Sequence, residues 1–149
     1  IATAHELLAE QGFEDIDIKH LIQKLSSAIL NYSSSDSRSV KIATIGDTVL
    51  VNADTASSVM LVINELLSNS LEHGFRNKKT GNINIRISNE EVFAIFTITD
   101  DGDGFQKKTN FESLGLNIVK AVVKDKLNGN LRIHTSKSGT VTEFSIKIK

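Results

Sequence analysis

The chain has 149 residues, of which 40% are hydrophobic and 23% are charged, and its formal net charge is −1. This length suffices for one domain with a hydrophobic core, and the near-neutral charge gives no electrostatic support for binding nucleic acid or an anionic membrane. The lack of cysteine excludes disulfides and thiolate metal sites. No apolar run approaches the roughly 20 residues that span a bilayer.

Apolar periodicity predicts two helices and two short strands in the first third of the chain. Residues 2–11 are expected to form one helix, and a second helix is expected to begin after Asp15 or Asp17, either of which can cap it. Two short strands are predicted near 40–44 and 48–52. The apolar residues of the second helix recur at helical spacing. They are Ile18, Leu21, Ile22, Leu25 and Ile29.

A longer helix is predicted in the middle of the chain. Asp54 is expected to cap its start, and Gly74 is expected to end it. Glu65, Asn69 and His73 are spaced one turn apart, so they share a polar face of this helix. The opposite stripe is expected to be buried and comprises Ala56, Val59, Met60, Ile63, Leu66, Leu67, Ser70 and Leu71.

Two hairpins and one more helix are predicted in the second half. The first hairpin joins strands at 83–87 and 92–99, a helix covers 114–127, and the second hairpin joins 130–135 and 140–148. These elements predict an α+β fold, a two-layer α/β sandwich with helices on one face of a mixed, mostly antiparallel sheet. A doubly wound fold would need parallel strands linked by helices, and the hairpins argue against it.

Three polar segments suggest a nucleotide site. The Asn69 carboxamide offers a neutral hard oxygen of the kind that Mg²⁺ accepts, and Glu65, one turn earlier, could orient or deprotonate a nucleophile. Asp100 ends a buried strand and needs a hydrogen-bond donor, such as the exocyclic amino group of adenine. Gly102 and Gly104 would let the backbone approach a flat base.

The third segment surrounds Gly115 at the start of the predicted helix at 114–127, where backbone N–H groups suit phosphate oxygens. Each segment also has an ordinary explanation, as a polar helix face, a loop after a strand or a plain helix start. Their occurrence together, in this order, favours the nucleotide interpretation.

At these residues the chain resembles the GHKL, or Bergerat-fold, ATPase superfamily, which includes gyrase, Hsp90, MutL and sensor histidine kinases. Four segments covering about residues 40–148 carry the resemblance. They are the N box at Asn64, Glu65, Asn69 and His73; a glycine box at Asp100, Asp101, Gly102, Asp103 and Gly104; a second glycine box at Ser113, Leu114, Gly115 and Leu116; and a terminal segment at Gly139 and Thr140, where Thr142 could take the threonine's place instead.

The resemblance implies ATP and Mg²⁺ as cofactors. Asn69 would ligate Mg²⁺, Asp100 would hydrogen-bond adenine, and Glu65 and Asn69 would be the catalytic residues. The other residues implied to bind the nucleotide are His73, Gly102, Gly104, Gly115, Leu116 and Thr140.

Within the superfamily, the chain is most similar to the catalytic domain of bacterial sensor histidine kinases with a short lid and a His-His-Arg-x-Lys-Asn-Asn phosphoacceptor block. The lid between the glycine boxes is only 105–112, and the stretches at 1–8, 113–119 and 127–131 also fit this class. Residues 1–12 would then be the tail of an upstream dimerisation and phosphoacceptor helix, and 13–149 the ATP-binding domain.

This class implies a defined set of partners. The domain would phosphorylate a histidine on the upstream hairpin, which is absent from this sequence, for relay to a response regulator. The full-length protein would be a homodimer with this domain in the cytoplasm, without contact to nucleic acid or membrane.

Two departures from the pattern are Glu72, which stands where a basic residue usually meets phosphate, and Asp103, a third acidic residue in the glycine box. His73, Arg76 or Lys79 could compensate for Glu72. A serine kinase of the anti-sigma-factor type is an alternative, because Glu72-His73-Gly74-Phe75 also resembles its N box. A non-catalytic module of the same fold is a further alternative.

Overall fold

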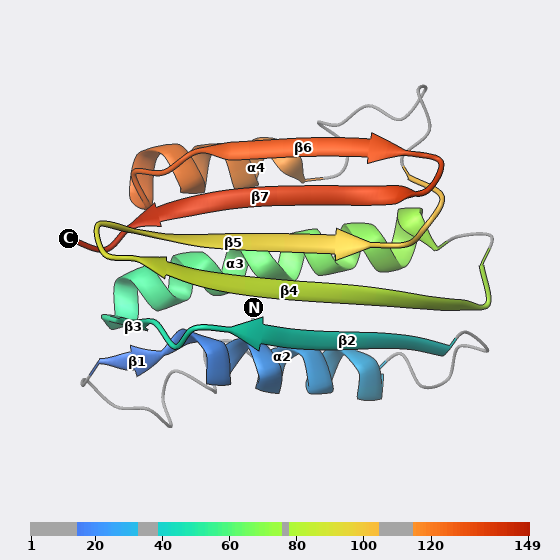
Figure 1. Cartoon of the computed structure of the whole chain (residues 1–149), viewed down its shortest axis with the longest axis horizontal. Helices are drawn as coiled ribbons and strands as arrows, with labels where there is room; N and C mark the ends of the chain where they lie inside the picture. The colour runs from blue at the N-terminus through green and yellow to red at the C-terminus, as the bar shows by residue number, and fades with distance from the viewer. Residues whose placement is uncertain (1–14, 33–38, 76–77, 105–114) are drawn as a thin grey trace.

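The computed structural model describes residues 15–32, 39–75, 78–104 and 115–149. Its elements follow one another along the chain as shown in Figure 1. They are β1 (Ile16–Asp17), α2 (Ile18–Tyr32), β2 (Ser39–Gly46), β3 (Leu50–Val51), α3 (Ala53–Asn69), η1 (Ser70–Gly74), β4 (Thr80–Glu90), β5 (Phe93–Asp100), α4 (Leu116–Ala121), η3 (Val122–Lys126), β6 (Leu131–Ser136) and β7 (Gly139–Lys147).

Five strands form the main sheet, in the order β2-β4-β5-β7-β6. The β4–β5 and β6–β7 hairpins and the β5–β7 pair are antiparallel, whereas β2 pairs with β4 in parallel, with Ser39 opposite Thr80. The parallel pair is possible because α3 returns the chain to the same end of the sheet between the two strands. The sheet is therefore mixed and mostly antiparallel, as predicted.

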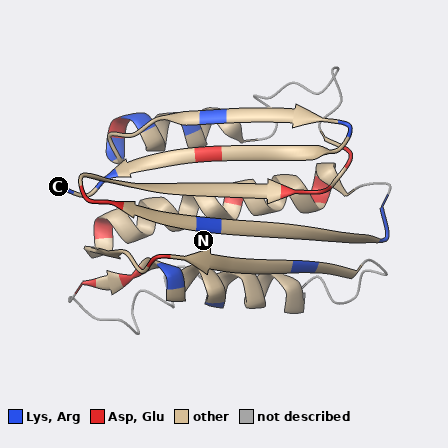
Figure 2. Ribbon diagram, in the orientation of Figure 1, with Lys and Arg blue, Asp and Glu red and all other residues tan. Residues whose placement is uncertain are grey.

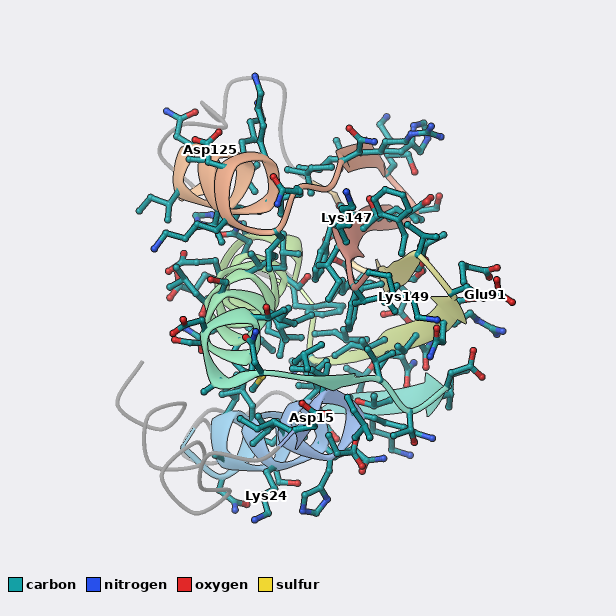
Figure 3. All side chains as sticks on the ribbon, turned by 90° about the vertical axis from the view of Figure 1, so that its left-hand side faces the viewer. Asp15, Lys24, Glu91, Asp125, Lys147 and Lys149 are labelled. Carbon is teal, nitrogen blue, oxygen red and sulfur yellow. The ribbon has the colours of Figure 1, made fainter. Side chains whose placement is uncertain are left out.

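The three α-helices in the described ranges pack on one face of this sheet, with α3 between α2 and α4 (Figures 1 and 3). Buried and more exposed side chains alternate along β4 and β5. Because successive side chains of a strand point to opposite faces, the buried ones share the face that the helices cover. Phe96 and Phe144 stack at the centre of the sheet, with ring centroids 4.8 Å apart. The predicted two-layer α/β sandwich is confirmed.

Helix α3 forms the centre of the helical layer. Its N-cap is Asn52, whose side-chain oxygen accepts a hydrogen bond from the Thr55 backbone N–H at 2.9 Å, so the predicted cap at Asp54 is wrong by two residues. Asp54 lies in the first turn instead, where its charge suits the helix dipole. At its other end α3 continues into the π-helical turn η1, and the helical path ends at Gly74 as expected.

The first third of the chain differs most from the prediction. The strand expected at 48–52 is only two residues long, and it pairs with β1, which was not predicted, in a separate two-stranded sheet. Asp17 caps α2 by accepting a hydrogen bond from the His20 backbone N–H at 3.2 Å. The helix predicted at 2–11 lies outside the described residues. None of the helices in the described ranges is long and apolar enough to cross a membrane.

Candidate nucleotide-binding site

Buried polar side chains gather near the end of the sheet where β5 finishes. Six polar residues are buried in the part of the chain that the structure describes. Ser26 is the exception to the clustering, since it lies on α2. The other five are Asn69, Ser70, Asp100, Thr140 and Thr142. Because a buried polar group is costly without a partner, such a concentration marks this end as a candidate site.

Asp100 is the centre of this cluster, with only 4% of its surface exposed. Its Oδ1 atom accepts hydrogen bonds from the backbone N–H groups of Gly102 at 3.0 Å and Thr140 at 3.3 Å. Its Oδ2 atom accepts a hydrogen bond from the Ser70 hydroxyl at 2.7 Å. Donors from η1, from the glycine-rich turn after β5 and from β7 thus hold one buried carboxylate.

Glycines let the backbone close around Asp100. A Cβ atom on Gly102 would lie 2.3 Å from the Gly74 carbonyl oxygen. On Gly139, which has φ of +135°, a Cβ atom would lie 2.0 Å from the Asp100 carbonyl oxygen. Gly74 faces the Asp100 carboxylate directly, because a Cβ there would lie 3.6 Å from Oδ1. A side chain at Gly102 or Gly139 would push apart the strands and turn that position the carboxylate.

The next residue, Asp101, fastens the glycine-rich turn to the start of β4. Its carboxylate accepts hydrogen bonds from the Asn82 backbone N–H at 2.8 Å and from Asn82 Nδ2 at 3.0 Å. Partial burial acts to raise the pKa of Asp101, but the hydrogen bonds from Asn82 and the nearby Lys78 charge together hold it below its ordinary value. Figure 2 shows the acidic end of β5 and the basic segment leading into β4 at the same edge.

Asp103, which the sequence pattern left unexplained, has two contacts. Its backbone N–H donates to the Gly74 carbonyl at 2.8 Å, and its carboxylate lies 3.8 Å from Lys78 Nζ. Lys78 Nζ also donates to the Asp101 carbonyl at 2.7 Å. Lys78 therefore joins the glycine-rich turn to the segment that precedes β4.

The predicted polar face of α3 points toward the start of α4. A Cβ atom built on Gly115 would lie 2.6 Å from Glu65 Oε2, so the carboxylate rests against the Gly115 backbone, which has φ of +74°. Asn69, one turn later on α3, is 5% exposed, and its Nδ2 atom has no hydrogen-bond partner among the described residues. The unpartnered atom is a donor, so an outside acceptor, such as a phosphate oxygen, would satisfy it.

Thr140 and Thr142, the two candidates for the threonine of the terminal segment, lie at different positions along β7 relative to Asp100. Thr140 is paired opposite Asp100, and Thr142 is paired opposite Ile98, farther along the strand. The Thr140 hydroxyl lies 3.0 Å from the Thr135 hydroxyl on β6. Gly104 packs against the same part of β6, because a Cβ there would lie 2.1 Å from the Ser136 carbonyl oxygen.

Two further predicted residues, His73 and Leu116, make no hydrogen bond to Asp100 in the described part of the chain. The His73 side chain is 27% exposed, and its Nε2 atom lies 4.0 Å from the carboxylate of Glu72, whose side chain is 72% exposed. Leu116 is a buried core residue at the start of α4. Arg76, one of the residues expected to compensate for Glu72, lies outside the described residues.

Sequence reasoning missed the role of Ser70. The helical periodicity predicts Ser70 in the buried stripe of α3 and indicates no hydrogen-bond partner for its hydroxyl. A polar residue within an apolar stripe is itself a signal, because a buried hydroxyl needs a partner. The pattern does not identify the partner of the Ser70 hydroxyl, which is Asp100, 30 residues later in the sequence.

A separate open groove of about 510 Å³ lies at the opposite end of the sheet, and its lining includes Asp15, Leu50, Asn52, Lys147 and Lys149. Figure 3 views the molecule from this end and labels Asp15, Lys147 and Lys149 there. No predicted site residue lines the groove. It is therefore distinct from the cluster around Asp100.

The two-layer sandwich is the fold of a domain of the GHKL type. Residues 54–149 match the family "Histidine kinase-, DNA gyrase B-, and HSP90-like ATPase". The chain belongs to this ATPase family, and the match confirms the resemblance drawn from the N box and glycine boxes.

Similar proteins and solved structures are histidine kinases. The chain is 30% identical over 135 residues to "Sensor histidine kinase PdtaS" of Mycobacterium tuberculosis, covering 88% of this chain and 27% of that protein. Its structure is similar to the histidine kinase domain of a blue-light activated histidine kinase from Erythrobacter litoralis EL346, with a TM-score of 0.78, 26% identity, and coverage of 89% of this chain and 61% of that one. The catalytic domain of histidine kinase ThkA shares the fold, with a TM-score of 0.71 and 17% identity. The match covers 91% of this chain and 95% of that one.

Proposed function

We propose that this chain is the catalytic and ATP-binding domain of a two-component sensor histidine kinase. It would transfer the γ-phosphoryl group of MgATP to a histidine on an upstream hairpin, for relay to a response regulator. The chain spans about a quarter of the length of the curated relatives it matches, which are named sensor histidine kinases. The observation that carries the proposal is the buried Asp100 carboxylate, held by three protein donors with capacity for one more.

Asp100 is the proposed adenine contact. A carboxylate has about four acceptor sites on its two oxygens, and the protein fills three of them. The exocyclic amino group of adenine is a donor that could use the fourth. Gly74 has no side chain that could cover this carboxylate, since a Cβ atom there would lie 3.6 Å from Oδ1, so a flat base could approach on that side.

Asn69 and Gly115 are the proposed contacts to the metal and the phosphates. The Asn69 carboxamide fits Mg²⁺, which takes few protein ligands and completes its shell with phosphates and water. When bound, the ion would neutralise charge on the phosphates during transfer. Asn69 would hold the ion, the Gly115 backbone would approach the phosphates, and the Glu65 carboxylate beside Gly115 would orient the incoming acceptor.

The proposal includes partners outside the described residues. Residues 1–12 would be the end of the upstream dimerisation helix, the full-length protein would be a homodimer, and this domain would lie in the cytoplasm. Because phosphoryl transfer depends on positioning more than on covalent chemistry, the acceptor hairpin must dock beside Glu65 and Asn69.

Calorimetric titration with MgATP tests the adenine contact. The wild-type domain is expected to bind, and Asp100→Asn is expected to abolish detectable binding, because an amide NH₂ would face a protein donor in place of an acceptor oxygen. Asp47→Asn is the matched control. Asp47 accepts a hydrogen bond from the Asn89 backbone N–H, far from the site, and its variant should bind as the wild type does.

Two results would count against the proposal. Undiminished binding by Asp100→Asn would exclude Asp100 as the adenine contact. No binding by the wild type, both in this domain and in a longer chain that contains the hairpin, would favour a non-catalytic module. Acid-labile phosphohistidine on the longer chain would distinguish a histidine kinase from a serine kinase of the same fold.

A further inference from the structure

Two buried serines on helices use their hydroxyl groups in different ways. Ser26 on α2 and Ser70 at the end of α3 are each 4% exposed. The Ser26 hydroxyl donates to the Ile22 carbonyl of its own helix at 2.8 Å, the usual solution for a serine inside a helix. The Ser70 hydroxyl instead leaves its helix and donates to Asp100 Oδ2 on β5 at 2.7 Å.

The helix geometry around Ser70 leaves its hydroxyl free for this contact. Its backbone N–H donates to the carbonyls of Leu66 and Leu67, and its carbonyl accepts from the Phe75 N–H five residues later at 3.0 Å. The π-helical turn η1 begins at Ser70, and such turns often occur at functional sites. The backbone groups of Ser70 are thus satisfied, and its side chain is directed at the strand.

The contact also restricts the Asp100 carboxylate. Oδ1 already accepts from two backbone N–H groups, of Gly102 and Thr140, so its orientation is set by β7 and the glycine-rich turn. Oδ2 accepts from Ser70 alone among the described hydrogen bonds. Once the hydroxyl occupies one acceptor direction of Oδ2, the carboxylate can present only one further acceptor site, on that oxygen.

We propose that Ser70 is a positioning residue that aims this last acceptor site of Asp100 Oδ2 and thereby selects 6-aminopurine over 6-oxopurine triphosphates. The inference rests on the proposed nucleotide function. Adenine carries a donor at purine position 6, which Oδ2 can accept. Hypoxanthine carries an oxygen at the same position, which would face the carboxylate oxygen without a proton between them. Oδ1 cannot turn to compensate, because two backbone donors hold it.

The test compares two ligands that differ in the purine ring at and beside position 6. MgATP and MgITP are titrated into the wild type, Ser70→Ala, Ser70→Thr and Ser26→Ala. Ser70→Ala is expected to weaken MgATP binding by about tenfold or more, because the acceptor site of Oδ2 is no longer aligned with the adenine amino group, and MgITP binding by less than about twofold. Ser70→Thr retains the hydroxyl and should retain the ATP preference. Ser26→Ala removes an equally buried hydroxyl and should leave both affinities unchanged.

The ratio of the two affinities separates positioning from simple support of the fold. Equal weakening of both ligands by Ser70→Ala, or no weakening of either, would overturn the inference. Thermal unfolding of each variant by circular dichroism shows that folded protein is being titrated. Failure of the wild type to bind either nucleotide would instead count against the proposed function, so the two failures are distinguishable.

Discussion

The two ends of the five-stranded sheet contain different chemistry within the same two layers. Where β5 ends, four buried polar side chains cluster with Asp100, and glycines bring the backbone close together. At the opposite end, the buried strand residues are apolar, among them Ile87, Ala94 and Ile146. Both ends pack against helices on one face (Figure 1).

The difference shows which end is built mainly for stability. Apolar burial is favourable at about 25 cal/mol per Å², whereas a buried polar group contributes little net stability even when it is hydrogen-bonded. The polar end therefore gives up hydrophobic stabilisation that the same volume could have supplied. We expect substitutions at the apolar end to cause the largest losses in the free energy of unfolding. Substitutions at the polar end should cost less stability, and those at the nucleotide site should change nucleotide affinity.

The largest effect on stability is expected from Ile146→Ala. Ile146 is fully buried on β7, opposite Ala94, and its truncation should lower the free energy of unfolding by about 2–5 kcal/mol. The affinity of the folded protein for MgATP should not change. Urea unfolding and calorimetry measure the two quantities. Ile45→Ala is the same substitution at a residue that is 43% exposed, and it should lower the free energy of unfolding far less. A large loss of MgATP affinity in Ile146→Ala would contradict the assignment of stability to the apolar end and binding to the polar end.

A smaller effect, which depends on pH, is expected from Asp101→Ala. The variant loses two hydrogen bonds from Asn82, so the free energy of unfolding should fall by about 1 kcal/mol at neutral pH. The pKa of Asp101 in the folded protein is below the ordinary value of 3.8. The contribution is therefore complete above pH 3.8 and is lost as the pH falls through the lower folded value.

Urea unfolding at neutral pH and below pH 3.8 checks this sign, because the gap between wild type and variant should narrow in acid. Asp103→Ala is the control from the same turn. Its carboxylate makes an exposed contact with Lys78, so its loss should be nearly neutral. A gap that widens in acid would contradict the assignment.

The smallest effect is expected from Glu72→Lys. The Glu72 side chain is largely exposed, and reversing its charge should favour a triphosphate held nearby, tightening MgATP binding by about two- to fivefold at low salt. Glu90→Lys makes the same change at the opposite end and should have no effect. An unchanged or weaker affinity in Glu72→Lys would show that Glu72 does not face the phosphates.

Local patterns in the sequence predicted the helices and hairpins of the second half of the chain, together with Asp100 at the end of a buried strand. Side-chain periodicity reveals which residues face the core, and it does so within one element. It does not identify the neighbouring strand, so the β1–β3 pair and the parallel β2–β4 pair were not foreseen. The Ser70–Asp100 hydrogen bond joins residues far apart in sequence, and Ser70 begins a π-helical turn. No local sequence pattern predicts this hydrogen bond. The ligand roles of Asn69 and Thr140 stay predictions.

The parallel pairing of β2 with β4 has a consequence for the order of folding. Ser39 can meet Thr80 only when the chain between them has turned back, and that chain contains all of α3. Closing such a loop costs entropy before any contact is gained, so pairing between distant segments is slow. We expect the β4–β5 and β6–β7 hairpins to form early and β2 to join the sheet late, after the helix that carries Glu65 and Asn69 has taken its place.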